Sequence, residues 1–291
     1  MEKTMTPARQ ARRSLSKTYR KDIWNPFVQA MKTYQLLSPG DRVAVCISGG
    51  KDSMLLAVLM DMLQKYSDFP FEVVNLSMDP GYSPENRRRI EENAEKLALP
   101  LEFFETDIFR VTQRHGGESP CYLCARMRRG YLYARAQALG CNKIALGHHR
   151  TDVLETTLLS MFYGGQLQSM PPRLKSTSHP GMELIRPLYC VDEADILRWC
   201  DYNDLHFIRC ACRFTEEAER AGEDSGRSKR QEMKELLRTL KQTNPNIENN
   251  LFNSIHNVHL DTFAGYRSRG QVHPFLERFE EDDPSDKKEG M

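Results

Sequence analysis

The sequence lacks three features that would place the protein in another class. No stretch of its 291 residues approaches the ~20 consecutive apolar residues that a membrane-spanning helix needs. Its basic start is not followed by an apolar run, so no secretory signal is expected. The net charge is only +1, so overall charge gives no argument for binding nucleic acid. We therefore expect a cytoplasmic protein that has no membrane partner.

Charge is nevertheless segregated at the two ends of the chain. The region before Asn25 carries seven Lys and Arg residues and only two acidic ones, and Arg12–Tyr34 is predicted to be helical. Arg12, Arg13 and Lys17 lie near one stripe of that helix, where they could hold an RNA phosphate backbone without reading its sequence. Residues 1–40 are therefore expected to form a basic helical segment, and residues 277–291 an acidic, disordered tail.

The order of apolar segments predicts an α/β fold. Short apolar strands alternate with longer helical patterns from residue 41 to residue 190, which is typical of a parallel sheet with helices on both faces. Residues 191–276 are predicted to be mainly helical, and 215–229 to be a loose, charged connection. The expected strands are Val43–Ile47, Phe71–Met78, Leu101–Glu105, Lys143–Leu146 and the extended segment Met182–Pro187.

A glycine-rich turn joins the first of these strands to the helix predicted at Asp52–Lys65. Glycines let the backbone approach an anion closely, and the amides of the helix N-terminus then face that anion. The hydroxyl groups and the lysine of the turn add donors and charge, although the spacing is not that of a Walker A loop. The candidate phosphate-binding residues are Ser48, Gly49, Gly50, Lys51, Asp52 and Ser53.

A second candidate site follows the strand at Lys143–Leu146. Open α/β sheets bind ligands at the carboxyl ends of their strands, which is where Gly147, His148 and Asp152 are expected. Asp152 could join Asp52 in holding Mg²⁺, which prefers carboxylate oxygen. The alternative is that Asp152 only caps the following helix, and the two roles are compatible.

Eight cysteines in a reducing compartment are expected to be thiols or metal ligands rather than disulfides. Four of them fall in predicted strands or helices and are assigned to packing: Cys46, Cys141, Cys190 and Cys200. The others form the pairs Cys121/Cys124 and Cys210/Cys212, whose unequal spacing is awkward for a zinc site built from two knuckles. Three of these four thiolates would instead suit a [4Fe–4S] cluster with one open iron.

With these motifs in view, the chain resembles the PP-loop pyrophosphatases, whose phosphate loop has the pattern SGGxDS. Within that class, residues 41–261 resemble the tRNA 2-thiocytidine biosynthesis proteins. The segments that carry the resemblance are Cys121–Tyr133, Lys143–His149, Met161–Gly165, Met170–Leu174 and Ile185–Leu188.

The resemblance implies a PP-loop fold of the adenine nucleotide alpha hydrolase type that binds ATP, Mg²⁺ and a [4Fe–4S] cluster. It implies that C2 of an anticodon-loop cytidine in tRNA is activated as an adenylate and then thiolated. Carried over by position, the cluster ligands are Cys121, Cys124 and Cys210, but Cys212 remains an alternative because this chain has Cys-Ala-Cys where the family has Cys-x-x-Cys. Arg128 and Arg129 are further candidates for RNA contact. A cysteine desulfurase is the expected sulfur donor, and a homodimer is a further expectation.

Three other functions are compatible with parts of the sequence. A PP-loop enzyme that amidates its substrate or attaches lysine to tRNA would need no cluster, and its cysteines would hold structural zinc. A non-catalytic iron–sulfur sensor that binds RNA would not need an intact phosphate loop. Thiolation of another base, such as uridine, would use the same chemistry.

Overall fold

The computed structural model describes residues 5–109, 111, 120–208 and 229–281, with the side chains of 120–125, 278, 280 and 281 left aside. The chain divides into two compact units, Met1–Leu236 and Leu237–Met291. The boundary expected at residue 190 falls inside the first unit, because the helix that follows it packs onto the helix after the phosphate loop. Cys210, Cys212 and most of the charged connection lie outside the described residues.

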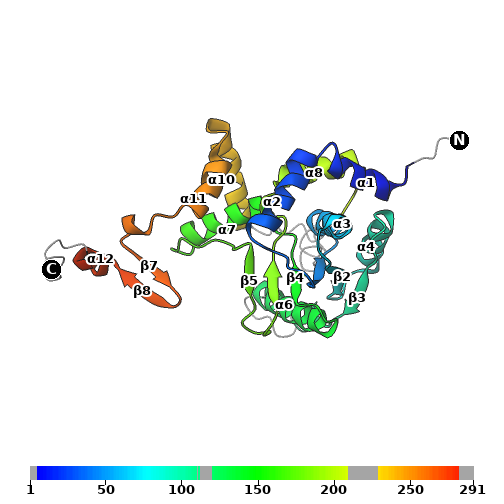
Figure 1. The fold of residues 1–291 in the computed structure, drawn as a ribbon, viewed down its shortest axis with the longest axis horizontal. Helices are drawn as coiled ribbons and strands as arrows, with labels where there is room; N and C mark the ends of the chain where they lie inside the picture. Colours follow the sequence, from blue (N-terminus) through cyan, green and yellow to red (C-terminus); the bar gives the residue numbers. More distant parts are fainter. Residues whose placement is uncertain (1–4, 110, 112–119, 209–228, 282–291) are drawn as a thin grey trace. The chain divides into compact units, whose positions relative to one another are not determined.

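The first unit is built on a six-stranded sheet with the strand order β3-β2-β1-β4-β6-β5 (Figure 1). Every neighbouring pair is parallel except β5 and β6, which are antiparallel. The strands are β1 (Arg42–Ile47), β2 (Glu72–Asp79), β3 (Glu102–Glu105), β4 (Lys143–Ala145), β5 (Arg173–Lys175) and β6 (Glu183–Ile185). The predicted α/β fold is therefore confirmed, and β5 is a strand that the sequence did not predict.

Alternate residues of β1 supply two hydrophobic cores, because successive side chains of a strand point to opposite faces. Val43, Val45 and Ile47 belong to the larger core, whereas Ala44 and Cys46 belong to a smaller one on the other face. The larger core is covered by α1, α3, α4 and α8, and the smaller one by α6 (Figure 1). These helices span Pro7–Ser16 (α1), Lys51–Tyr66 (α3), Pro84–Lys96 (α4), Pro120–Ala138 (α6) and Glu193–Tyr202 (α8).

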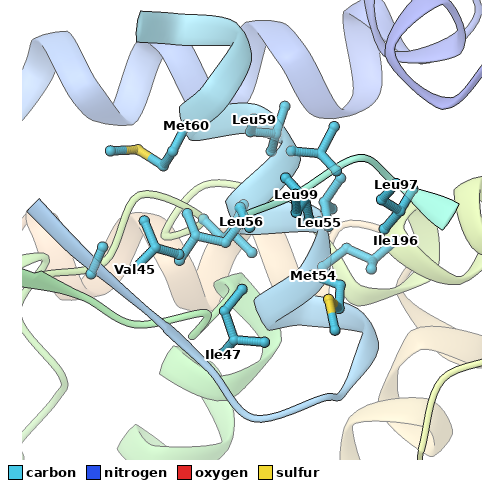
Figure 2. Packing of buried hydrophobic residues seen from close by; sticks show 14 of the residues in the cluster. Val45, Ile47, Met54, Leu55, Leu56, Leu59, Met60, Leu97, Leu99 and Ile196 are labelled. Carbon is cyan, nitrogen blue, oxygen red and sulfur yellow. The ribbon is translucent and has the colours of Figure 1, made fainter. Parts of the chain in front are cut away.

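Helix α3 is the central helix of the larger core. Every residue from Ser53 to Met60 is buried, so α3 is apolar all round rather than amphipathic. Figure 2 shows Met54, Leu55 and Leu59 of α3 packed among side chains from the sheet, the α4–β3 connection and α8. This burial fixes the helix that begins directly after the phosphate loop.

The continuous helix expected at Arg12–Tyr34 is wrong. Helix α1 ends at Ser16, a π-helical turn follows at Arg20–Trp24, and α2 runs over Asn25–Thr33. Pro26 lies in the first turn of α2 and has no N–H to donate to the carbonyl four residues earlier. That missing bond falls where the π-helical turn changes into α2, whereas the helix itself is interrupted earlier, by a turn at residues 17–19. Buried Leu15, Ile23 and Phe27 keep all three pieces on the core.

The other expected elements are found with ends shifted by one or two residues. The remaining helices are α7 (Arg150–Phe162), α10 (Lys229–Thr243) and α11 (Ile247–His256), and α10 crosses the boundary between the units. The second unit also contains a 3₁₀ turn (Leu260–Thr262), an antiparallel hairpin and α12 (Phe275–Glu281). The hairpin pairs β7 (Gly265–Ser268) with β8 (Gln271–Pro274), in a region that was expected to be mainly helical. Among the described residues, no helix has the length and apolar character needed to cross a membrane.

Lys143 at the start of β4 is a buried charge on which the sheet depends. Its side chain is 2% exposed, and its Nζ lies 3.2 Å from Asp41 Oδ2 and 2.9 Å from Glu183 Oε2. The same ammonium group donates to the Leu36 carbonyl oxygen at 3.1 Å. A buried lysine is tolerated when its donors and charge are matched in this way.

We predict that Lys143→Ala lowers the free energy of unfolding by about 3–5 kcal/mol, because it leaves two carboxylates without their buried cation. Urea unfolding followed by circular dichroism measures the change. Arg88→Ala is the matched control, since the Arg88–Glu92 pair is 70% and 64% exposed and such pairs contribute about 1 kcal/mol or less. Equal losses in the two variants would contradict the prediction.

Candidate active site

The candidate site lies where the strand order of the sheet reverses. Strand β1 has β2 on one side and β4 on the other, so chain connections leave β1 and β4 in opposite directions. Ligands of open α/β sheets bind at such a point, outside the carboxyl ends of the strands. The phosphate loop follows β1, and Gly147–His149 follow β4, so both sequence-predicted segments meet there.

The phosphate loop depends on two glycines that no other residue could replace without a shift in structure. Gly49 has φ +84°, and a Cβ there would lie 2.5 Å from Ile90 Cγ1 and 2.7 Å from Ile208 Cδ1. Gly147 brings the end of β4 against the start of α3, where a Cβ would lie 3.0 Å from the backbone carbon of Asp52 and the backbone nitrogen of Ser53. Gly147 therefore positions the loop by close packing.

The start of α3 presents free amides to the site. Among the described residues, no side chain caps its N-terminus at Gly50, whereas Thr6 caps α1 and Ser83 caps α4. The hydroxyl of Ser53 accepts from the Ser48 backbone N–H at 3.1 Å and donates to the Gly50 carbonyl at 2.9 Å, which closes the loop on itself. An uncapped helix N-terminus behind a glycine turn is a binding site for phosphate.

A polar cavity of about 250 Å³ opens beside this helix start. The residues around it come from four helices and the β4–α7 connection, and most are charged. They are Lys51, Asp52, His149, Asp152, Glu155, Glu193, Arg230, Gln231 and Lys234. The cavity thus joins the two predicted acidic positions with charged residues that the sequence analysis did not select.

His149 lies between the two aspartates. Its Nε2 is 3.7 Å from Asp52 Oδ1, and its Nδ1 is 3.5 Å from Asp152 Oδ2. Asp152 and His149 also form the capping box of α7, so the expected capping role of Asp152 is observed together with its place at the cavity. Asp52 Oδ1 is buried and makes no hydrogen bond to the described residues. The two carboxylates offer the hard oxygen donors that Mg²⁺ prefers, so the residues fit that ion.

His148, which was expected to bind ATP, is not among the residues that line the cavity. Burial lowers the pKa of its imidazole to about 4, despite the nearby charge of Asp152. The ring is therefore neutral at neutral pH. The sequence showed two adjacent histidines after a strand and did not indicate which one faces the site. Because α7 begins at Arg150, the second histidine, His149, caps the helix and faces the aspartates.

An ion-pair network crosses the cavity. Lys51 Nζ lies 3.0 Å from Asp52 Oδ2 and 3.1 Å from Glu193 Oε1, and Lys234 Nζ lies 2.5 Å from Glu193 Oε2. Burial raises the pKa of Glu193, but the hydrogen bond from Lys234 and the charges of both lysines outweigh it and lower the pKa to about 2. Arg230 completes the network, as its guanidinium contacts Asp152 at 3.3 Å and Glu155 at 2.9 Å.

Glu155, Glu193, Arg230 and Lys234 were missed because nothing local marks them. Arg230 and Lys234 belong to a charged run that resembles a solvated helix face, and Glu193 is an ordinary acidic residue in a first helical turn. Only the tertiary fold places them at the phosphate loop, from which each of the four is more than 100 residues away in the sequence. A sequence pattern without spatial information could not identify them.

The packing role predicted for four cysteines is confirmed for three of them. Cys46, Cys141 and Cys200 are buried, whereas Cys190 is only partly buried. Burial raises the pKa of the Cys46 and Cys200 thiols to about 12 and that of Cys190 to about 11, and it also raises the pKa of Cys141. All four are therefore protonated at neutral pH and are poor metal ligands.

Cys121 and Cys124 lie in the first turns of α6, as the sequence predicted. Cys210 lies outside the described residues, but Ile208, two positions earlier, packs against Gly49 of the phosphate loop. The chain therefore passes the nucleotide site directly before the second cysteine pair.

The arginines and lysine predicted to bind RNA differ in their surroundings. The Arg12 side chain is 20% exposed, pairs with Asp61 at 2.8 Å and donates to the Leu97 carbonyl at 2.8 Å. Its guanidinium thus has partners within the fold. Arg13, Lys17 and Arg129 are exposed, whereas Arg128 is partly buried with its guanidinium over the Phe109 ring.

Comparison with known proteins identifies the family of the chain. Residues 19–220 match the PP-loop domain family. The tRNA-cytidine(32) 2-sulfurtransferases of Burkholderia mallei and Burkholderia pseudomallei are each 36% identical over 259 residues, which cover 84% of this chain and 74% of theirs.

The U34-tRNA thiolase NcsA from Methanococcus maripaludis, solved with its [4Fe-4S] cluster, has a similar fold. The TM-score is 0.63 at 19% identity, over 81% of this chain and 78% of the thiolase. At that identity the likeness concerns the fold alone. The extent of the first two matches, together with the phosphate loop at the sheet reversal, shows that the chain belongs to the PP-loop family and, within it, to the tRNA-cytidine(32) 2-sulfurtransferase family.

Proposed function

We propose that this protein is an ATP-dependent tRNA sulfurtransferase that converts an anticodon-loop cytidine to 2-thiocytidine. The observation that carries the proposal is one cavity in which the uncapped N-terminus of α3 meets Asp52 and Asp152. Family membership extends that observation from nucleotide binding to sulfur transfer to tRNA.

In the first step, the C2 oxygen of cytidine attacks the α-phosphorus of ATP. An O–P bond forms, the bond between the α-phosphorus and the bridging oxygen breaks, and pyrophosphate leaves. The amides at Gly49–Ser53 and the Lys51 ammonium bind the phosphates and stabilise charge on the departing pyrophosphate. Asp52 and Asp152 would hold Mg²⁺, which neutralises phosphate charge when bound.

In the second step, sulfur bonds to C2 and the C2–O bond breaks, so that AMP leaves with the original oxygen. Activation is required because the unmodified oxygen is a poor leaving group, whereas AMP is a good one. A [4Fe–4S] cluster held by Cys121, Cys124 and Cys210 would supply an iron site for sulfide when bound. Such clusters use thiolate ligands, and burial raises the thiol pKa of the four other cysteines, which leaves the pairs Cys121/Cys124 and Cys210/Cys212 as the candidate donors. A cysteine desulfurase is the class of enzyme that would provide the sulfur, as a persulfide from which a thiol reductant would release sulfide by supplying two electrons.

Thiolation of a uridine is the second candidate, and the fold shared with a U34-tRNA thiolase is the observation that favours it. The same cavity and the same leaving-group chemistry would serve either base. Mass spectrometry of tRNA nucleosides from a strain that lacks the protein separates the two: loss of 2-thiocytidine supports the cytidine assignment, and loss of a 2-thiouridine overturns it.

The phosphate loop should be essential for activation. We predict that Asp52→Asn and Ser53→Ala each reduce tRNA-dependent AMP formation by at least about 100-fold, the scale for losing one group that stabilises developing charge. The release of pyrophosphate from ATP labelled in its terminal phosphates measures the rate. Asp68→Asn is the control, because Asp68 is an exposed carboxylate in a turn. A wild-type rate in Asp52→Asn would remove Asp52 from the catalytic site.

The cluster should need three cysteines. We predict that anaerobically prepared Cys121→Ala, Cys124→Ala and Cys210→Ala each lose iron, sulfide and thiolation, while tRNA-dependent release of pyrophosphate, which reports adenylylation, is retained. Ligands must be thiolates, and the protonated Cys141 provides the control, whose replacement by Ala should retain the iron. If Cys212→Ala loses the cluster and Cys210→Ala keeps it, the third ligand is Cys212. A zinc-containing chain would contradict the cluster altogether.

The exposed cations of the first helical segment should hold RNA by charge alone. We predict that Arg13→Glu combined with Lys17→Glu weakens tRNA binding and flattens its dependence on salt, because fewer counterions are released. Filter binding at salt concentrations from about 50 to about 200 mM gives the slope of log affinity against log salt concentration. Lys65→Glu on α3 is the control, as Lys65 is an exposed cation elsewhere on the same unit. An unchanged slope would exclude residues 13 and 17 from the interface.

A further inference from the structure

We propose that Arg230 and Lys234 of α10 bind the β- and γ-phosphates of the nucleotide. The proposal rests on the proposed ATP-dependent activation and adds a second cationic wall to the phosphate loop. These two cations come from a helix that is far from the phosphate loop in the sequence. In this structure, ion pairs with acidic residues hold them at the cavity.

The two cations are placed to act together. They are four residues apart on α10, so they project from one face of the helix about one turn apart. Both line the cavity that also contains Lys51 and Asp52. Lys234 and Lys51 share Glu193, with Nζ to carboxylate distances of 2.5 and 3.1 Å. The phosphate-loop lysine and the α10 lysine are therefore linked through a single carboxylate.

Arg230 pairs with Asp152, the carboxylate that is also proposed to hold Mg²⁺. Asp152 Oδ1 lies 3.3 Å from the Arg230 guanidinium, and Asp152 is the proposed second Mg²⁺ ligand. If Asp152 held Mg²⁺, the Arg230 guanidinium would keep its contact with Glu155, and its other N–H donors would be available to phosphate oxygens. A guanidinium presents a planar fork of donors that matches phosphate oxygens in pairs.

Helix N-termini around the cavity also favour phosphate, and bound Mg²⁺ would offset the four carboxylates that line it. Helices α3, α7 and α8 all begin at residues around it, and α10 begins at Lys229, beside Arg230. Helix N-termini attract negative charge, and in this structure Asp52, Asp152 and Glu193 occupy the first turns. A polyphosphate entering the cavity meets the same attraction.

Both cations stay accessible to solvent although they pair with buried carboxylates. The Arg230 side chain is 48% exposed and that of Lys234 is 28% exposed, whereas Glu155 and Glu193 are 6% and 16% exposed. Replacing either cation would leave a buried carboxylate unpaired, and the Glu155→Gln variant separates that effect from ligand binding. Both cations extend from α10 into the polar cavity, where they can contact a bound ligand.

The test is calorimetric binding of three probes with Mg²⁺: α,β-methylene-ATP, inorganic pyrophosphate and AMP. We expect Arg230→Ala to weaken the affinity for the ATP analogue and for pyrophosphate about 10- to 100-fold, which is the scale of one or two charge-assisted hydrogen bonds. The affinity for AMP should change by no more than about twofold. Lys234→Ala should show the same selectivity. Arg238→Ala is the matched control, an exposed arginine on the same helix, and should bind all three probes as the wild type does.

Two results would overturn the proposal. One is an unchanged affinity of Arg230→Ala for the ATP analogue, or an equal loss for the analogue and AMP, which indicates a general distortion of the site. The other is restoration of analogue affinity by adding Glu155→Gln to Arg230→Ala, which would mean that Arg230 only neutralises Glu155. Partial recovery in Arg230→Lys supports the proposal, because charge returns without the paired donors.

Failure of this inference can be told apart from failure of the proposed function. If the wild-type chain forms AMP with tRNA but Arg230→Ala binds the analogue normally, only the α10 assignment fails. If the wild-type chain forms no AMP with tRNA, the proposed activation fails, while the binding measurements still decide the role of Arg230.

Discussion

The close approach of two backbone segments is the constraint on which the rest of the site depends. Gly147 at the end of β4 packs directly on the backbone of Asp52 and Ser53, with room for no side chain. This contact sets the distance between the phosphate loop and α7, so His149 and Asp152 face Asp52 across one cavity. Because every residue of α3 from Ser53 to Met60 is buried, the loop cannot shift to relieve a bulkier residue at position 147.

Much of this arrangement could be predicted from the sequence because its signals are local. A strand, a glycine turn and an apolar helix identify the phosphate loop, and repetition of strand and helix identifies the sheet. The change from a π-helical turn to α2 at Pro26 could also have been found, since proline removes a specific helical hydrogen bond, but nothing local marks the turn at residues 17–19. In contrast, the choice of His149 over His148 depends on where α7 begins. The three-residue strand β5 is too short to show a period, and it forms only because β6 offers an edge.

The electrostatics of the cavity could not be predicted, since they come from distant elements. Lys51 reaches Glu193 of α8, and Asp152 reaches Arg230 of α10, so each charge in the phosphate loop region has a partner from another helix. The low pKa of Glu193 shows that the fold keeps this carboxylate ionised against the effect of burial. The side chains around the cavity thus stay ionised, so their ion pairs can be exchanged for ion pairs with a highly charged ligand.

The two outer strands of the sheet bear on how the chain behaves at high concentration. Strands β3 and β5 are four and three residues long, and both carry charged side chains: Glu102 and Glu105 on β3, Arg173 and Lys175 on β5. Short, charged edge strands offer a poor template for pairing with another chain, which is how sheet proteins avoid aggregation through their edges. Within the part of the chain that the structure describes, the sheet ends at these two strands, whose short, charged edges disfavour pairing between copies.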